Sequence, residues 1–168
     1  WGLLVQEKLA PVEIGHRIVV VDTSALMEHP ELLHGLISND ILVVPLRALS
    51  ELDGLKSSED ETRAAKARSA IRQLDANSSR IRHEKDHTAL LPAEWDARES
   101  DHAILSTALF FRLNAVLFVS NDINLRNKAK SLGLNTQDSK SYASSRLVPA
   151  AASEAHVQIK NKQKNIRR

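Results

Sequence analysis

The chain has 168 residues and a mass of 18.6 kDa, the size of about one domain, and its composition of 42% hydrophobic and 26% charged residues argues against a wholly disordered chain. The absence of cysteine excludes a disulfide framework, a thiolate zinc site and a cysteine nucleophile, and we expect a reducing compartment such as the cytoplasm. The net charge is only +2, and no apolar run approaches the roughly 18 residues of a transmembrane helix, so we expect no membrane partner.

Three short apolar runs are predicted to be buried β-strands. Continuous apolar runs of this length are typical of a parallel sheet that is covered on both faces. These runs are residues 18–21, 41–44 and 116–119. We expect Pro45 to stop the second run. Weaker patterns near 80–82 and 134–136 predict a fourth and a fifth strand.

Helical patterns alternate with these strands. Some of these segments carry apolar residues at helical spacing, and others begin at or directly after a proline. The predicted helices are residues 30–38, 46–56, 60–76, 100–112 and 123–132. Polar residues 83–99, interrupted by Pro92, predict a long surface loop. The alternation predicts an α/β domain, a three-layer α/β/α arrangement with a roughly five-stranded, mostly parallel sheet.

The predicted domain spans residues 16–142. Residues 1–15 form an N-terminal segment or linker, and residues 143–168 form an Ala/Ser-rich linker and a basic tail. Five basic and no acidic residues lie in 160–168, so the remainder has 18 basic against 21 acidic side chains, a net charge of −3. Such a tail is either a solvated linker or a contact for phosphates. Because the first residue is Trp1, we expect a processed chain or a piece of a longer one.

Four acidic residues are predicted to gather at one edge of the sheet, because ligands of open α/β sheets bind beyond the carboxyl ends of the strands. Asp22 ends the first strand, and Asp122 follows the third. Asp101 lies in the first turn of one predicted helix, and Glu51 lies within another. Unpaired, these carboxylates would repel one another, and the usual resolution is Mg²⁺ or Mn²⁺. Two such ions about 4 Å apart can activate a water and stabilise the leaving oxygen of a phosphodiester.

Each acid also has a purely structural explanation. Asp22 would close a strand, Asp122 would cap a helix, and Asp101 would complement a helix dipole. Glu51 would be an ordinary exposed helical residue. Position and composition alone leave the metal pocket and these structural roles evenly weighted.

Four segments together resemble the PIN-domain family of metal-dependent ribonucleases. They occur in the family's order and are residues 21–26, 44–55, 101–105 and 119–129. The Ser-Glu-Leu-Asp-Gly-Leu and Asn-Asp-x-x-Leu-Arg-x-Lys-Ala stretches look most like two branches of the family. One branch contains the eukaryotic RNA quality-control endonucleases, and the other contains bacterial PIN domains attached to PhoH-like ATPases.

The resemblance implies an endoribonuclease that acts on single-stranded RNA, uses Mg²⁺ or Mn²⁺ as two ions, and leaves 5′-phosphate and 3′-hydroxyl ends. The catalytic, metal-binding acids would be Asp22, Glu51, Asp101 and Asp122. The polar positions that support them would be Thr23, Ser24, Ser120 and Asn121. One departure is a further acid, Glu99, which would share the metal or favour the start of the helix.

Four basic residues are candidates for RNA binding. Arg68 resembles an arginine that recurs near the groove in the family, and Lys66 lies on the same predicted helix. Arg126 and Lys128 follow the fourth acid. The alternative for all four is a solvated, charged helix face.

The competing interpretation is a catalytically silent PIN-like module that binds RNA or a partner protein. Two other acidic α/β folds fit the sequence less well. Haloacid-dehalogenase-type phosphatases need an aspartate at the position of Ser24. Receiver domains need a phosphoacceptor aspartate after a middle strand, and here the second strand ends at Pro45 with no such residue. There is no glycine-rich phosphate loop. A homodimer, an adjoining domain in a longer chain, and a toxin or RNA-processing role all stay open.

Overall fold

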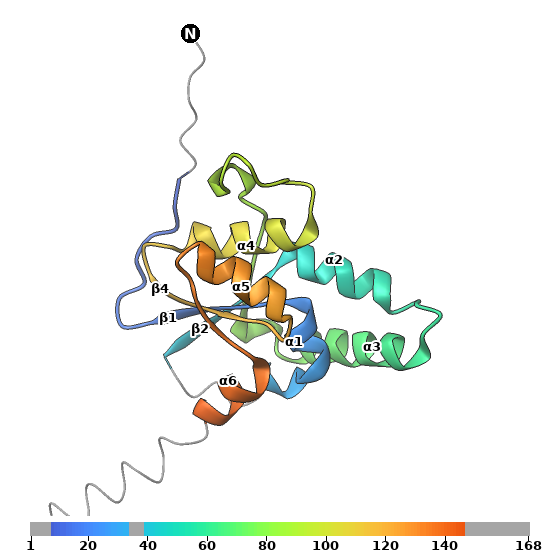
Figure 1. Cartoon of the computed structure of the whole chain (residues 1–168). Helices are drawn as coiled ribbons and strands as arrows, with labels where there is room; N and C mark the ends of the chain where they lie inside the picture. The colour runs from blue at the N-terminus through green and yellow to red at the C-terminus, as the bar shows by residue number, and fades with distance from the viewer. Residues whose placement is uncertain (1–7, 34–38, 147–168) are drawn as a thin grey trace, which may run out of the picture.

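The structure, a computed structural model, describes residues 8–33 and 39–146 (Figure 1). Five parallel strands form one sheet in the order β3-β2-β1-β4-β5. The strands are β1 (Arg17–Val21), β2 (Asp40–Pro45), β3 (Ile81–Glu84), β4 (Ala115–Val119) and β5 (Asn135–Gln137). The α-helices are α1 (Thr23–Glu28), α2 (Leu46–Leu55), α3 (Glu61–Ala76), α4 (Ser100–Phe110), α5 (Ile123–Ser131) and α6 (Ser139–Arg146). None of the helices within these described ranges is long and apolar enough to cross a membrane.

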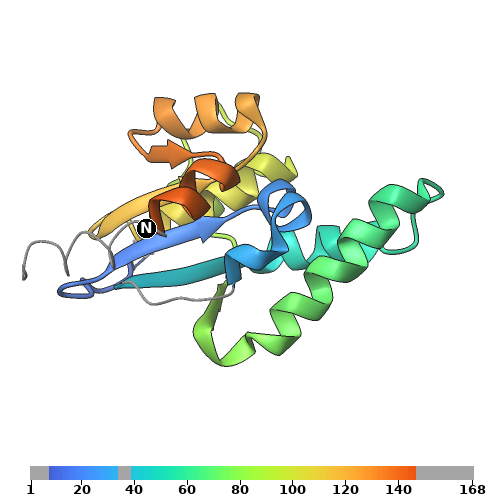
Figure 2. The same ribbon diagram turned by 90° about the horizontal axis from the view of Figure 1, so that it is seen from below.

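The central strands are covered on both faces, which confirms the predicted α/β architecture. Val20 of β1 pairs with Val43 of β2 and with Phe118 of β4, and all three side chains are fully buried. Helices α4 and α6 lie on opposite faces of the sheet (Figure 2). Burial on both faces explains why these strands are continuous runs of β-branched and aromatic residues instead of alternating patterns.

Local structure meets the expectation at Pro45 and differs from it at two other places. Pro45 stops the second strand as expected, since it is the last residue of β2, in register with Glu84 of β3. At the end of a strand, a residue without an N–H costs the ladder little. The helix predicted at 30–38 is a 3₁₀ turn over Pro30–Leu33 as far as it can be followed, since residues 34–38 lie outside the described chain. Helix α1, which precedes it, is not among the predicted helices.

The segment predicted as a surface loop, 83–99, is anchored to the domain. It begins inside β3 and contains a 3₁₀ turn at Thr88–Leu90. His87 is 4% exposed and stacks on Phe110 with ring centroids 3.9 Å apart. Its backbone N–H donates a 2.9 Å hydrogen bond to the Ser106 hydroxyl of α4. The segment after β3 is therefore held firmly against α4.

The described parts of both flanking segments pack on the domain. The N–H of Ala10 donates to the Phe110 carbonyl at 2.9 Å, and Ala10 is buried. At the other end, α6 continues four residues past the expected boundary at 142, and Tyr142 is buried with its hydroxyl on Asp40 at 3.0 Å. The boundaries stay a prediction, and the basic tail lies outside the described residues.

Candidate active site

Two of the predicted acids follow neighbouring strands and are N-caps. Asp22 follows β1 and accepts a 3.0 Å hydrogen bond from the N–H of Ala25 in α1. Asp122 follows β4 and accepts a 3.1 Å bond from the N–H of Leu125 in α5. Because β1 and β4 are parallel neighbours, both acids lie at the carboxyl edge of the sheet. The capping roles are real and do not exclude a further role.

The Asp22 carboxylate is buried among hydroxyl donors. It is 3% exposed and accepts hydrogen bonds from Ser24 Oγ at 2.9 Å and Ser120 Oγ at 2.7 Å. Burial, with a smaller contribution from the negative charge of Glu51, raises the pKa of Asp22 to about 6, although the hydrogen bonds to the carboxylate act to lower it. The site therefore places a negative charge where it is poorly solvated and where a cation would be favoured.

The same two serines attach the turn after β4 to Asp22. Ser120 Oγ accepts a 3.0 Å hydrogen bond from the N–H of Asp122, and Ser24 Oγ accepts one of 3.0 Å from the N–H of Asn121. One hydroxyl thus bridges the first and fourth acids. The predicted supporting residues Ser24, Ser120 and Asn121 come together in the structure.

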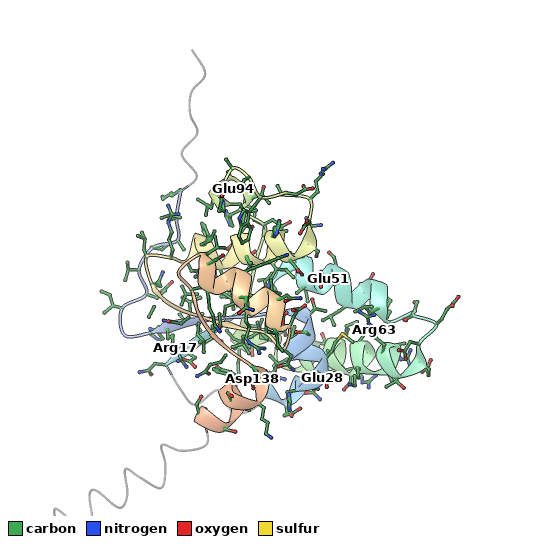
Figure 3. All side chains as sticks on the ribbon, viewed as in Figure 1. Arg17, Glu28, Glu51, Arg63, Glu94 and Asp138 are labelled. Carbon is green, nitrogen blue, oxygen red and sulfur yellow. The ribbon has the colours of Figure 1, made fainter. Side chains whose placement is uncertain are left out.

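Glu51 joins the site from α2. Its carboxylate accepts hydrogen bonds from the hydroxyls of Thr23, the neighbour of Asp22, and Ser100, the neighbour of Asp101. Figure 3 shows Glu51 beside α1 and far from Arg17, which begins β1 at the opposite edge of the sheet. Hydrogen bonds therefore connect Asp22 to Asp122 through Ser120, and connect Glu51 to Thr23 and Ser100, which adjoin Asp22 and Asp101.

Asp101 is a far more open part of the site than Asp22. Its side chain is 42% exposed and lies 3.5 Å from the ammonium of Lys128. The same ammonium is 3.6 Å from Glu99, whose carboxylate is also 3.2 Å from His102 Nε2. Glu99 thus belongs to the charged rim around Asp101, and Lys128 supplies a positive charge at the position where the acids are exposed.

Three residues that the sequence did not indicate support this site. One is Ser100, described above. The other two reach Asn121: its side-chain oxygen accepts 2.9 Å bonds from both the N–H and the hydroxyl of Ser139 in α6. Since that hydroxyl donates to Asn121, it accepts from Nδ1 of His29. These contacts join residues that are between 18 and 110 positions apart in the sequence, so no local motif predicts them.

The donor set suits a hard divalent cation. All four acids supply carboxylate oxygens, and hydroxyl groups contact the carboxylates of Asp22 and Glu51, a donor set that favours Mg²⁺ or Mn²⁺ over zinc. In the positions described for residues 8–33 and 39–146, no three acidic or histidine side chains are grouped closely enough to hold an ion. Glu51 is instead turned to two hydroxyls and Asp101 to Lys128.

All four predicted RNA-binding residues have protein partners. Lys66 is 2.7 Å from Glu28, and Arg68 pairs with Glu61 and donates to the Lys56 carbonyl at 3.0 Å. Arg126 donates to the Ser120 carbonyl at 2.6 Å, which gives it a structural role beside the site. The fourth, Lys128, faces Asp101. Their contact with RNA stays a prediction.

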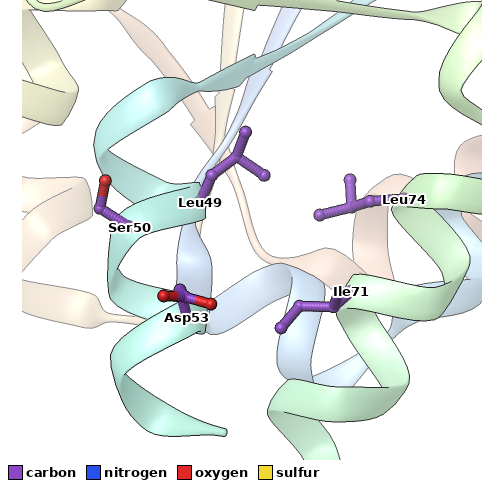
Figure 4. Close-up of a pocket in the computed structure, with 5 residues that line it drawn as sticks. All are labelled: Leu49, Ser50, Asp53, Ile71 and Leu74. Carbon is purple, nitrogen blue, oxygen red and sulfur yellow. The ribbon is translucent and has the colours of Figure 1, made fainter.

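A hollow between α2 and α3 is separate from the acids. It has a volume of about 470 Å³ and is lined by Leu49, Ser50, Asp53, Ile71 and Leu74. Figure 4 shows the leucine and isoleucine side chains converging from the two helices, with Ser50 on the other side of α2. Its lining includes none of the four acids.

Known proteins resemble this chain over most of its length. The family model described as "PIN domain" matches residues 19–140. Over 142 residues the chain is 30% identical to Protein PhoH2 of Thermobispora bispora, covering 73% of this chain and 31% of that protein. Over 126 residues it is 31% identical to Transcriptional protein swt1 of Schizosaccharomyces pombe, covering 67% and 26% respectively. The chain thus spans about a third or less of these relatives.

Among solved structures, the PIN domain endonuclease Utp24 has a similar fold. The TM-score is 0.50 at 18% sequence identity, and the match covers 72% of this chain and 84% of that one. At this level of identity the likeness concerns the fold alone.

Proposed function

The chain belongs to the PIN domain family, as its four motifs indicated, and on that premise we propose that it is a divalent-metal-dependent endoribonuclease that cleaves single-stranded RNA. PIN domains are typically nucleases and generally use divalent metals. The observation that carries the proposal is the set of hydrogen bonds that links the surroundings of Asp22, Glu51, Asp101 and Asp122 at one edge of the sheet. We further propose that it acts in the cytoplasm or another reducing compartment.

The four acids would hold the metal, as two ions of Mg²⁺ or Mn²⁺. When bound, such ions polarise a water for attack on phosphorus and stabilise the leaving oxygen of the phosphodiester. Binding requires the Lys128 ammonium to give way at Asp101. Because Lys128 already neutralises the exposed acid, it is suited to approach an RNA phosphate once a metal has taken its place.

The other side chains orient these ligands. Ser24 and Ser120 fix the Asp22 carboxylate and keep it away from water, so that its oxygens keep one direction. Thr23 and Ser100 place Glu51 between the first and third acids. Catalysis by bound metals depends on ligands held in position beforehand, and outer partners of this kind commonly matter about 10- to 100-fold.

The decisive experiment is a cleavage assay on single- and double-stranded RNA and DNA, with Mn²⁺ and with EDTA. Cleavage of single-stranded RNA that requires Mn²⁺ and disappears in Asp22→Asn would support the proposal. The control is Asp75→Asn, which makes the same chemical change at an exposed position near the end of α3. Binding of RNA without cleavage at any metal concentration would instead favour the silent module.

A further inference from the structure

A second polar hollow lies at the same edge of the sheet, next to α2. It has a volume of about 390 Å³ and is lined by Leu46, Arg47, Ser50, Lys85 and Asp86. The carboxyl ends of β2 and β3 are paired, and the residues that directly follow these two strands line the hollow. Ser50, on the side of α2 away from α3 in Figure 4, borders it. The hollow is therefore at the edge of the sheet where the acids lie.

Arg47 connects this hollow with the acidic site. It precedes Glu51 by four residues in α2, so the two side chains share one face of the helix, one turn apart. Its guanidinium is 2.5 Å from Asp86 and is 40% exposed. The ion pair ties Arg47 to Asp86, which also lines the hollow.

The chemistry of the lining combines positive charge with an apolar contact. The lining includes two cations, Arg47 and Lys85, and one acid, Asp86. Lys85 makes no ion pair with any residue in 8–33 or 39–146. Leu46 is 45% exposed, one of the few large apolar side chains on the described surface. Proteins that bind single strands combine cations along the backbone with apolar or aromatic platforms for the bases.

We propose that this hollow binds one nucleotide of the RNA strand next to the scissile phosphate. Lys85 and Arg47 contact its phosphate, and Leu46 packs against its base. A volume of about 390 Å³ lies in the range of small-ligand sites and gives room for one nucleotide. This inference rests on the proposed function, since it deepens the description of how that site takes its substrate.

The first test reverses the charge of Lys85. Binding of a fluorescein-labelled, single-stranded RNA of about 12 nucleotides is measured by anisotropy in EDTA, across a series of salt concentrations. Lys85→Glu is expected to weaken binding roughly tenfold at low salt and to lower the salt slope by about one. The matched control is Lys8→Glu, at an exposed lysine near the amino edge of the sheet, and it should stay within about twofold of wild type.

The second test changes the charge in the opposite direction. Asp86→Asn neutralises the one acid among the described residues that line the hollow, and it frees Arg47. It is expected to tighten RNA binding about threefold, whereas Asp75→Asn on α3 should not. Opposite effects of Lys85→Glu and Asp86→Asn, with both controls near wild type, cannot arise from a loss of folding.

Kinetics separate this inference from the proposed function. With Mn²⁺, Lys85→Glu should raise KM for the RNA by about the same factor as the Kd and leave kcat within about twofold. If the wild type cleaves RNA but Lys85→Glu and Lys8→Glu have the same RNA affinity and the same KM, the nucleotide site alone is overturned. Opposite binding effects in a protein that never cleaves would retain the site and overturn the nuclease. A wild type that does not bind RNA would overturn both.

Discussion

The acidic site has an inner half, made by Asp22 and the turn after β4, and an outer half around Asp101, and the two halves are held in different ways. Asp22 is 3% exposed and is fixed by Ala25, Ser24 and Ser120, all within about one turn of the central strands. The Asp101 side chain is 42% exposed, and its one polar side-chain partner among the described residues is Lys128 at 3.5 Å. The inner half is organised by the fold, while the outer half depends on whichever cation occupies it. Metal and substrate should therefore act mainly on the outer half.

The largest expected effect is the loss of cleavage when either acid is neutralised, and the melting temperature separates the inner acid from the outer one. Asp22→Asn and Asp101→Asn should each reduce cleavage by more than about a hundredfold, because each removes a proposed metal ligand. In EDTA at neutral pH, Asp22→Asn should melt at or above the wild type, because it removes a poorly solvated charge. Asp101→Asn should leave the melting temperature nearly unchanged, since its carboxylate is well solvated. Thermal melts of both variants test this.

Adding Mn²⁺ sharpens the same comparison. The wild type should be stabilised by mass action, and both variants should respond much less. RNA binding by Asp101→Asn should survive or tighten, because one negative charge near the phosphates has gone. An equal Mn²⁺ shift in the wild type and Asp22→Asn would indicate that the metal binds elsewhere and that the inner acid only caps α1.

Much of the inner half could be predicted from the sequence. Strand ends are visible as apolar runs that stop, so the order of residues alone places Asp22 and Asp122 at one edge of the sheet. Helix α1 escapes prediction because it has six residues and begins with Thr23 and Ser24, which also suit a turn. Helix α6 escapes it because its eight residues are almost all polar, and only Tyr142 marks its buried side.

The outer partners could not be predicted, for a different reason. Ser100 contacts Glu51 across 49 positions, and His29 contacts Ser139 across 110. A serine or histidine in a polar stretch carries no signal of such contacts, because only the folded chain brings them together. The ion pair of Lys66 with Glu28 is likewise a contact between two helices. Together with the Arg68–Glu61 pair inside α3, it explains why a basic helix face need not be free for RNA.

The pH dependence of stability is the next largest expected effect. Burial raises the pKa of Asp22 from 3.8 to about 6, so between these values the folded chain keeps a proton that the unfolded chain has lost. In EDTA, the contribution of this group to stability should therefore be highest below about pH 4 and fall by about 3 kcal/mol as the pH rises through 6. Chemical denaturation of wild type and Asp22→Asn at several pH values isolates this contribution. A difference between the two proteins that does not change with pH would mean that the carboxylate is solvated.

A smaller effect is expected where α6 supports the inner half. Ser139→Ala removes the hydroxyl that joins His29 to Asn121 but keeps the backbone bond. We expect roughly tenfold slower cleavage and a higher Mn²⁺ requirement, because the turn that carries Asp122 is held less firmly. Ser141→Ala, on the same helix, removes only a hydroxyl bond to Asp138 and is the control. A lower melting temperature with an unchanged Mn²⁺ requirement would make Ser139 a purely structural residue.

The smallest expected effect concerns Arg68, which belongs to neither half of the site. Its guanidinium pairs with Glu61 and binds the Lys56 carbonyl, so it joins the start of α3 to the end of α2. If it also contacts phosphate, Arg68→Ala should weaken RNA binding alike for all sequences and lower the salt slope by about one. At saturating RNA the cleavage rate should stay within about tenfold of wild type, because uniform binding acts on apparent affinity. The matched comparison is Lys66→Ala, on the same helix as Arg68, which breaks the pair with Glu28 of α1. If Arg68→Ala leaves the salt slope unchanged, Arg68 only joins the two helices, and the RNA strand is expected to run past Lys128 and Arg47 instead.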